Sequence, residues 1–123
     1  MTDEMSQIVV SVMGEAAVVR FRRTECLLDS RNPRKDVGND LLALVEKDHY
    51  SLIIIDFDNP DILWLSATFL ALLVLLRHRM IKANGVLKLC HLPDAVKEQF
   101  RTSRLDEVFN IYPNVEAALS SDI

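Results

Sequence analysis

The sequence LIIIDF at residues 52–57, followed by DNPD at residues 58–61, decides the fold class. Five apolar side chains interrupted only by Asp56 are typical of a central strand that is covered on both faces. The Asp, Asn and Pro residues break this strand, and a long apolar helical segment then runs from about Ser66 to Ala83. A buried strand that leads into a long helix predicts a β–α crossover, the repeating unit of α/β folds.

The segments on both sides of this unit also alternate between strand and helix patterns. Asn84 and Gly85 tolerate the left-handed conformation at the end of the long helix. Ser103 has capping-box spacing to Asp106, which predicts a further turn, and Pro113 suits the first turn of a final helix. We expect strands over residues 8–13, 16–21, 52–57, 86–91 and 111–112, and helices over residues 37–47, 66–83, 93–100 and 113–119. The expected architecture is an α/β sandwich with parallel strand pairs joined by right-handed crossovers.

The composition is that of one globular domain, with 123 residues of which 50% are hydrophobic and 26% charged. We expect a single domain over residues 1–123, with its core at about residues 8–119. The net charge of −4 gives no basic field for nucleic acid or an anionic membrane. Two cysteines, Cys26 and Cys90, fit a reducing cytoplasm. The apolar run at residues 62–76 is shorter than the ~20 residues that cross a bilayer, which favours a packed or partner-facing helix.

The sequence contains no familiar pattern of a catalytic or cofactor site. The histidines lie far apart without a metal-ligand spacing, which indicates lone surface or strand-end side chains. The cysteines lie in strand-like surroundings without a CxxC pair and are expected to be buried small hydrophobes. Three glycines cannot form a GxGxxG or Walker loop. The sequence therefore predicts no enzyme, no metal and no cofactor. The three histidines are His49, His78 and His91.

The candidate functional region is the junction between the strand at residues 52–57 and the helix that follows it. In open α/β sheets, ligands and partners bind where the carboxyl end of a strand meets a helix N-terminus. Ser66 has the position of an N-cap residue, whose hydroxyl accepts from first-turn amides, and the same position favours a phosphate. Both interpretations remain open. The candidate partner-binding residues are Asp58, Asn59, Asp61, Trp64, Ser66, Thr68, Leu70 and Val74.

Two apolar features of this region each have two interpretations. Trp64 is either a core side chain or an anchor for a partner, because tryptophan is enriched in interface hot spots. The long helix has one apolar stripe that is expected to face the sheet, while other apolar side chains point elsewhere. Either neighbouring helices cover this second face, or it is a docking surface for another chain. The stripe is Phe69, Leu72, Leu73, Leu76 and Met80, and the second face is Leu70, Ala71, Val74 and Leu75.

Four stretches, taken in order, resemble the STAS domain, the fold of bacterial anti-sigma factor antagonists. They lie within residues 18–29 (VVRF to LLD), 41–46 (LLALVE), 52–59 (LIIIDFDN) and 84–112 (NGVLKLC to FRTSRLDEVFNIY). The resemblance spans roughly residues 8–119. It implies a mixed sheet of four to five strands with about four helices packed on it.

The resemblance also implies a regulatory domain that binds a serine kinase acting as an anti-sigma factor. Such domains are released when a serine or threonine at the start of the second helix is phosphorylated. Matched without gaps, the family's Asp-Ser-Ser/Thr-Gly-Leu motif falls on residues 64–68, where Ser66 matches its second serine. A slip of one residue puts Ser66 on the first serine and Phe69 on the Leu instead, and in both alignments the Asp and Gly are missing. Ser66 is therefore the phosphorylation candidate. A second hypothesis is a scaffold without a switch, or a homodimer, assembled through Leu70 and Val74. A third is a small-ligand-binding domain, against which the lack of a glycine loop weighs.

Overall fold

The computed structural model describes residues 8–22 and 37–121, and within them the chain forms one five-stranded mixed sheet with the order β1-β2-β3-β4-β5. The strands are β1 (Ile8–Met13), β2 (Ala16–Phe21), β3 (Leu52–Asp56), β4 (Val86–Cys90) and β5 (Asn110–Tyr112). The helices are α2 (Gly38–Glu46), α3 (Ala67–Lys82), α4 (Asp94–Thr102), the short 3-10 helix η3 (Leu105–Glu107) and α5 (Val115–Ser120).

The sheet is antiparallel only at its first pair. β1 and β2 form a hairpin through Gly14, whose φ of +63° is a conformation that glycine adopts without steric cost. β2, β3, β4 and β5 are parallel neighbours. Their carboxyl ends therefore lie at one edge of the sheet, which we call the carboxyl edge.

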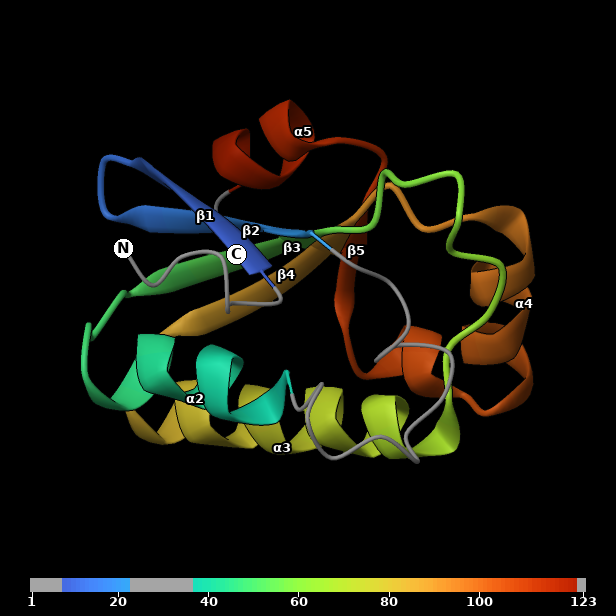
Figure 1. Cartoon of the computed structure of the whole chain (residues 1–123), viewed down its shortest axis with the longest axis horizontal. Helices are drawn as coiled ribbons and strands as arrows, with labels where there is room; N and C mark the ends of the chain where they lie inside the picture. The colour runs from blue at the N-terminus through green and yellow to red at the C-terminus, as the bar shows by residue number, and fades with distance from the viewer. Residues whose placement is uncertain (1–7, 23–36, 122–123) are drawn as a thin grey trace.

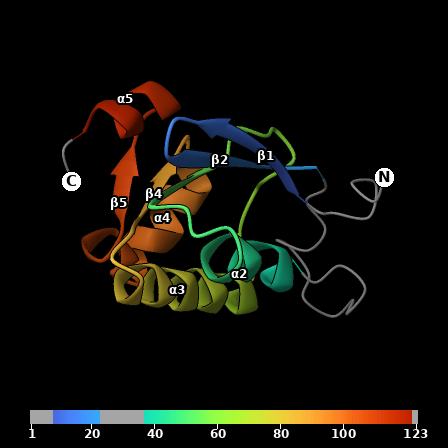
Figure 2. The ribbon, with the colours of Figure 1, turned by 90° about the vertical axis from the view of Figure 1, so that its left-hand side faces the viewer.

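The helices lie in two layers, with α2 and α3 on one face of the sheet and α5 on the other (Figures 1 and 2). The larger core lies between the sheet and α2, α3 and α4, and includes the mutually packed rings of Phe21, Phe57 and Phe69. A smaller core lies under α5. It consists of Val18, Ile54, Cys90, Val115 and Ala118. β3 is covered on both faces, as its apolar sequence predicts.

Most element predictions are confirmed, some of them to the residue. β1, β2 and the Gly14-Glu15 turn lie at the predicted positions. Ser66 is the N-cap of α3, and Asn84 takes a φ of +63° just after the helix ends. The β3 strand ends at Asp56, one residue earlier than expected, and the Phe57 N–H still donates to the carbonyl of Cys90 at 3.0 Å.

Two local predictions are wrong in detail. The turn at residues 105–107 forms, but Ser103 does not cap it, because its hydroxyl donates to the Gln99 carbonyl of the preceding helix instead. The last helix is capped by Asn114, whose side chain accepts from the Ala117 N–H, and Pro113 precedes the helix. Cys26 lies outside the described residues, whereas Cys90 is fully buried as predicted.

A buried lysine joins α5 to the sheet. Lys88 is 1% exposed, and its ammonium donates to the carbonyls of Ala118 at 2.7 Å and Ser121 at 3.2 Å. It also lies 5.2 Å from the centre of the Tyr112 ring. A cation at the C-terminal end of a helix complements the exposed carbonyls there. Lys88 therefore holds α5 against the sheet by polar contacts as well as by packing.

Candidate functional site

The loop between β3 and α3 is held in shape by its own side chains. Asp56 accepts through Oδ1 from the Asp58 N–H at 2.9 Å, and Asn59 accepts through Oδ1 from the Asp61 N–H at 2.9 Å. The Ile62 N–H donates to the Asn59 carbonyl at 3.1 Å. Such side chain to backbone bonds are the means by which Asp and Asn stabilise turns. The loop therefore has a defined conformation that begins at a buried carboxylate.

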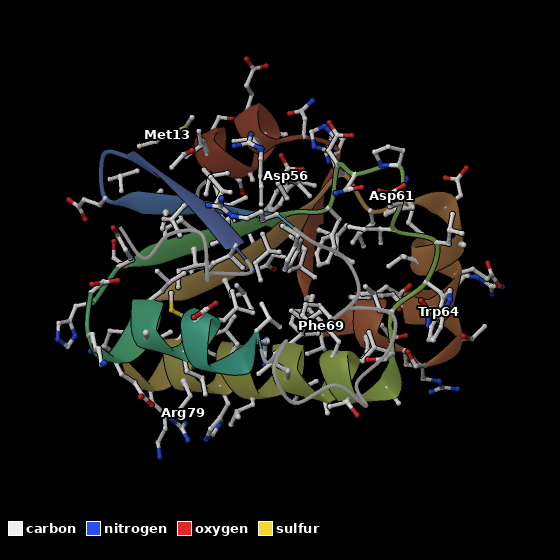
Figure 3. All side chains as sticks on the ribbon, viewed as in Figure 1. Met13, Asp56, Asp61, Trp64, Phe69 and Arg79 are labelled. Carbon is white, nitrogen blue, oxygen red and sulfur yellow. The ribbon has the colours of Figure 1, made fainter. Side chains whose placement is uncertain are left out.

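Two large apolar side chains of this loop are presented to the surface. The side chains of Ile62 and Leu65 are buried, with exposed fractions of 2% and 1%. Leu63 and Trp64, which lie between them in the chain, are 65% and 47% exposed. The side-chain amide of Gln99 on α4 fixes Leu65, because it accepts from the Leu65 N–H at 2.8 Å and donates to the Leu65 carbonyl at 2.9 Å. The interpretation of Trp64 as a core side chain is wrong. Figure 3 shows Trp64 on the loop beside α4.

Ser66 is a buried N-cap at the start of α3. Its Oγ accepts from the Phe69 N–H at 3.1 Å, and the residue is 7% exposed. Thr68, two positions later, is exposed. The N-cap interpretation is confirmed, and it leaves the hydroxyl of Ser66 less accessible than its position at the rim suggests.

The long helix has a buried stripe and an exposed apolar face. Phe69, Leu73, Leu76 and Met80 are buried, and Leu70 and Leu72 are half-buried against the same core. Leu70 therefore contributes less to the exposed face than the sequence suggests. Within the described ranges, five of the side chains left exposed on α3 lie at helical spacing on one face. We call them the outer face of α3: Ala71, Val74, Leu75, His78 and Ile81.

A polar cluster that the sequence analysis does not predict lies at the carboxyl edge. The Asp56 carboxylate is buried, with Oδ2 accepting from Arg20 Nε at 3.0 Å and Oδ1 lying 2.8 Å from Nδ1 of His91. Cys90 is the register partner of Asp56 on β4. Burial, together with the nearby Asp56 charge, raises the pKa of the Cys90 thiol to about 12. His91 is therefore at a strand end, as expected, but is not a lone side chain.

The cluster joins Asp56 to residues that lie 34 to 36 positions away from it, so spacing along the chain cannot reveal it. The signal was nevertheless present. Arg20, Asp56 and Cys90-His91 each stand at or just before the end of a predicted strand. Aligning the ends of predicted parallel strands brings them to one edge.

The predicted site residues differ in their exposure to solvent. Asp58, Asp61, Trp64, Thr68 and Val74 are exposed, Asn59 and Leu70 are half-buried, and Ser66 is buried. His49 and His78 are exposed and belong to neither the loop nor the cluster.

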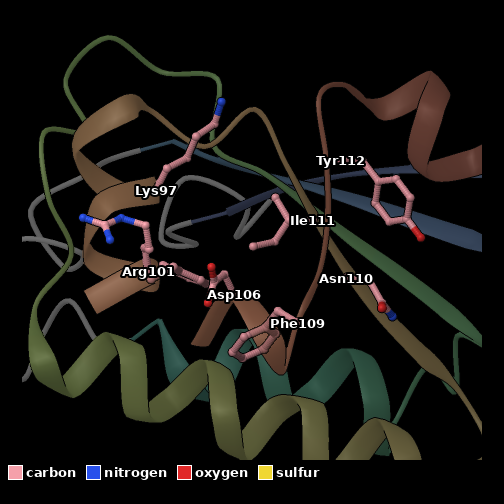
Figure 4. Close-up of a pocket in the computed structure, with 8 residues that line it drawn as sticks. Lys97, Arg101, Asp106, Phe109, Asn110, Ile111 and Tyr112 are labelled. Atoms are coloured by element: carbon pink, nitrogen blue, oxygen red, sulfur yellow. The ribbon is translucent and has the colours of Figure 1, made fainter. Parts of the chain in front are cut away.

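A further groove of about 580 Å³ lies between α4 and β5. Lys97 and Arg101 come from the helix, and Phe109 and Ile111 come from the strand side (Figure 4). The sequence gives no signal for this groove, because its two walls are separated by the η3 turn.

The helices of the described part of the chain are all too short or too polar to cross a bilayer. This agrees with the expectation that residues 62–76 do not form a membrane span.

Comparisons with known proteins identify the fold. The family model described as STAS domain matches residues 34–118. No curated protein matches the sequence. An anti-sigma-factor antagonist (STAS) domain protein from Planctomyces limnophilus is similar, with a TM-score of 0.76, 22% identity, and coverage of 91% of this chain and 94% of that chain.

Two further solved structures have the same fold at lower identity. A putative anti-sigma factor antagonist from Thermotoga maritima has a TM-score of 0.70 and 14% identity, over 91% of both chains. The phosphorylated form of the Bacillus cell fate determinant SpoIIAA has a TM-score of 0.60 and 13% identity, over 90% of this chain and 96% of that chain. At these identities the likeness shows the arrangement of helices and strands.

Proposed function

The chain belongs to the STAS domain family, and from this we propose that it is a non-catalytic regulatory domain, like an anti-sigma factor antagonist, which acts by binding a protein partner. The partner that we propose is a serine kinase that also acts as an anti-sigma factor. The binding surface is the β3–α3 loop with the outer face of α3.

The observation that carries this proposal is the exposed pair Leu63 and Trp64. Exposed tryptophan beside leucine is costly to leave in water, and tryptophan is the side chain most enriched in interface hot spots. Here the pair is held between two buried neighbours, and Gln99 fixes the backbone that follows. A partner that binds this pair meets a pre-ordered loop, so less conformational entropy is lost on association.

Regulation by phosphorylation at Ser66 is the second part of the proposal. A phosphoserine carries about −1.5 to −2 charges at pH 7. At the start of α3 it stands next to free helix amides, and the first turn of this helix has no acidic residue to repel it. The partner, in contrast, meets a new negative charge beside the apolar surface that it binds. Because Ser66 is 7% exposed, the kinase has to open the first turn to reach the hydroxyl.

The test of binding is isolation of the full chain from its native cells, followed by mass spectrometry of the bound proteins. We expect a serine kinase with wild type, and its loss with Trp64→Ala. The matched control is Val12→Ala, which removes another exposed apolar side chain, at 58%, from β1. Retention of the kinase by Trp64→Ala, or its equal loss from the control, contradicts the proposed surface.

The test of regulation is the intact mass of the same isolated protein. One phosphate is expected on wild type and on Thr68→Ala, and none on Ser66→Ala. A phosphate that persists in Ser66→Ala and disappears in Thr68→Ala assigns the modification to the exposed threonine instead.

The alternative function, a self-associating scaffold, is favoured by one observation. Val74, Leu75 and Ile81 are 42%, 39% and 51% exposed on one face of α3. Sedimentation of Val74→Asp distinguishes this function from the first. A wild-type dimer that becomes a monomer supports the scaffold, whereas a wild-type monomer removes it. Val74 is a better position than Leu70 for this test, because Leu70 packs partly against the core.

A further inference from the structure

Three side chains of metal-binding type meet at the carboxyl edge, on the face of the sheet that α5 covers. Asp56, Cys90 and His91 each offer one ligand atom, and these atoms all lie within 4.8 Å of one another. A tetrahedral zinc ion with bonds of about 2.0–2.3 Å separates its ligand atoms by roughly 3.3–3.8 Å. The cluster therefore needs side-chain shifts of only about 1 Å to surround such an ion.

The backbone directs the histidine into this cluster. His91 follows β4 with a φ of +57°, a left-handed conformation that is uncommon outside glycine. Its N–H donates to the Tyr112 carbonyl at 3.3 Å, and its ring nitrogen Nδ1 lies 2.8 Å from Asp56. Unfavourable backbone conformations of this kind persist where the surroundings fix them, and they are concentrated at binding sites.

The surroundings supply the outer contacts that metal ligands usually have. Arg20 holds Oδ2 of Asp56, and Oδ1 is the oxygen that faces His91. A second hydrogen bond to the ligating carboxylate orients it and is a regular feature of metal sites. Cys90 is fully buried, while the side chain of His91 is 33% exposed and gives an entry path from solvent.

We propose that Asp56, Cys90 and His91 form a zinc site, with Oδ1, Sγ and Nδ1 as its three protein ligands and water in the fourth position. Imidazole and thiolate favour zinc over magnesium or calcium, which prefer oxygen ligands. The metal replaces the thiol proton of Cys90, which leaves to the buffer. It also replaces the proton shared by Nδ1 of His91 and Oδ1 of Asp56, so that the imidazole binds the metal in the tautomer that carries its proton on Nε2. The carboxylate and thiolate charges then balance the dication, and Arg20 stays on the second oxygen.

The expectation that the sequence holds no metal site rests on spacing along the chain. That criterion detects ligands on one helix or one loop. It does not detect ligands that neighbouring parallel strands bring together.

The test uses the full chain, kept reduced, with Co²⁺ as a spectroscopic probe and Zn²⁺ as competitor. Cobalt bound to a thiolate gives an intense near-ultraviolet charge-transfer band. The informative variant is Cys26→Ser, which leaves Cys90 as the only thiol of the sequence. We expect a band that saturates at one Co²⁺ per chain in both wild type and Cys26→Ser, and that Zn²⁺ removes.

Two histidine variants separate the site from adventitious binding. His91→Asn keeps a residue that tolerates the left-handed conformation, and we expect it to weaken Co²⁺ binding at least tenfold. His78→Asn, on the exposed side of α3, is expected to leave Co²⁺ binding unchanged. Absence of the band in Cys26→Ser, or equal weakening by both histidine variants, overturns the proposal.

Discussion

Gln99 is the residue through which the fold positions the apolar loop, and Gln99→Ala tests that role. The amide of Gln99 makes two hydrogen bonds to the Leu65 backbone, at 2.8 and 2.9 Å. Each such bond contributes about 1 kcal/mol net, so their loss costs about 2 kcal/mol. Alanine is the better helix former, and the gain on α4 offsets about 0.4 kcal/mol. We expect the free energy of unfolding to fall by about 1.6 kcal/mol.

The assay is urea unfolding, followed by the fluorescence of Trp64, which is the single tryptophan of the sequence. A lower midpoint with an unchanged slope is the expected result. Hydrogen exchange of the Leu65 amide is a local readout, because this N–H loses its acceptor in the variant. The matched control is Glu98→Ala on the same helix, where the Glu98 carboxylate pairs with the exposed side chain of Arg101. Its effect on the unfolding midpoint is expected to be small, because both side chains of this ion pair are exposed to solvent.

The reasoning is refuted if Leu65 exchanges at the same rate in Gln99→Ala and wild type. It is also refuted if the two variants on α4 lose equal stability. In either case the loop is held by the burial of Ile62 and Leu65 alone.

Three further predictions concern the supports of the site. Ser66→Ala removes the cap of α3 and is expected to cost about 1 kcal/mol in urea unfolding, with exposed Thr68→Ala as a control near zero. Lys88→Ala is expected to cost at least about 1 kcal/mol more than Lys88→Met, since methionine refills the space under α5 and both variants lose the bonds to Ala118 and Ser121. The buried thiol of Cys90 has its pKa raised from 9.0 to about 12, so the folded state keeps a proton that the unfolded state releases above pH 9. The free energy of unfolding is therefore expected to fall between pH 9 and 12, with a chelator present, and Cys90→Ala removes that part of the slope.

The elements were predictable because their signals are local. The run at residues 52–57, the cap at Ser66 and the turn at Gly14 each depend on neighbours within a few positions, and the structure has them where the sequence places them. The capping role predicted for Ser103 and the helical position predicted for Pro113 are wrong, because a nearby group competes in each case. The Ser103 hydroxyl bonds back to α4, and Asn114 is a better cap than proline.

The environment of single side chains was less predictable, because it depends on contacts between distant elements. Lys88 lies in an alternating strand and has no sequence feature that marks it as buried. Its acceptors are carbonyls 30 and 33 residues away. The burial of Trp64 and Leu70 was also not predictable from the sequence, and the two side chains differ in opposite ways from what was expected. Both are apolar, yet the loop turns Trp64 outward and the helix phase turns Leu70 toward the core.

Asp56 connects the two regions of the molecule that we propose to be functional. Its Oδ1 accepts from the Asp58 N–H, the first bond of the loop, and faces His91 in the cluster. A charge change at the cluster therefore acts on the residue from which the loop starts, while Gln99 fixes the loop at its other end. The buried carboxylate is stable because a guanidinium, an imidazole and a backbone amide all surround it, which offsets the loss of its hydration. An apolar residue at position 56 would suit a strand covered on both faces, but it would leave Arg20, His91 and the loop amide without their common acceptor.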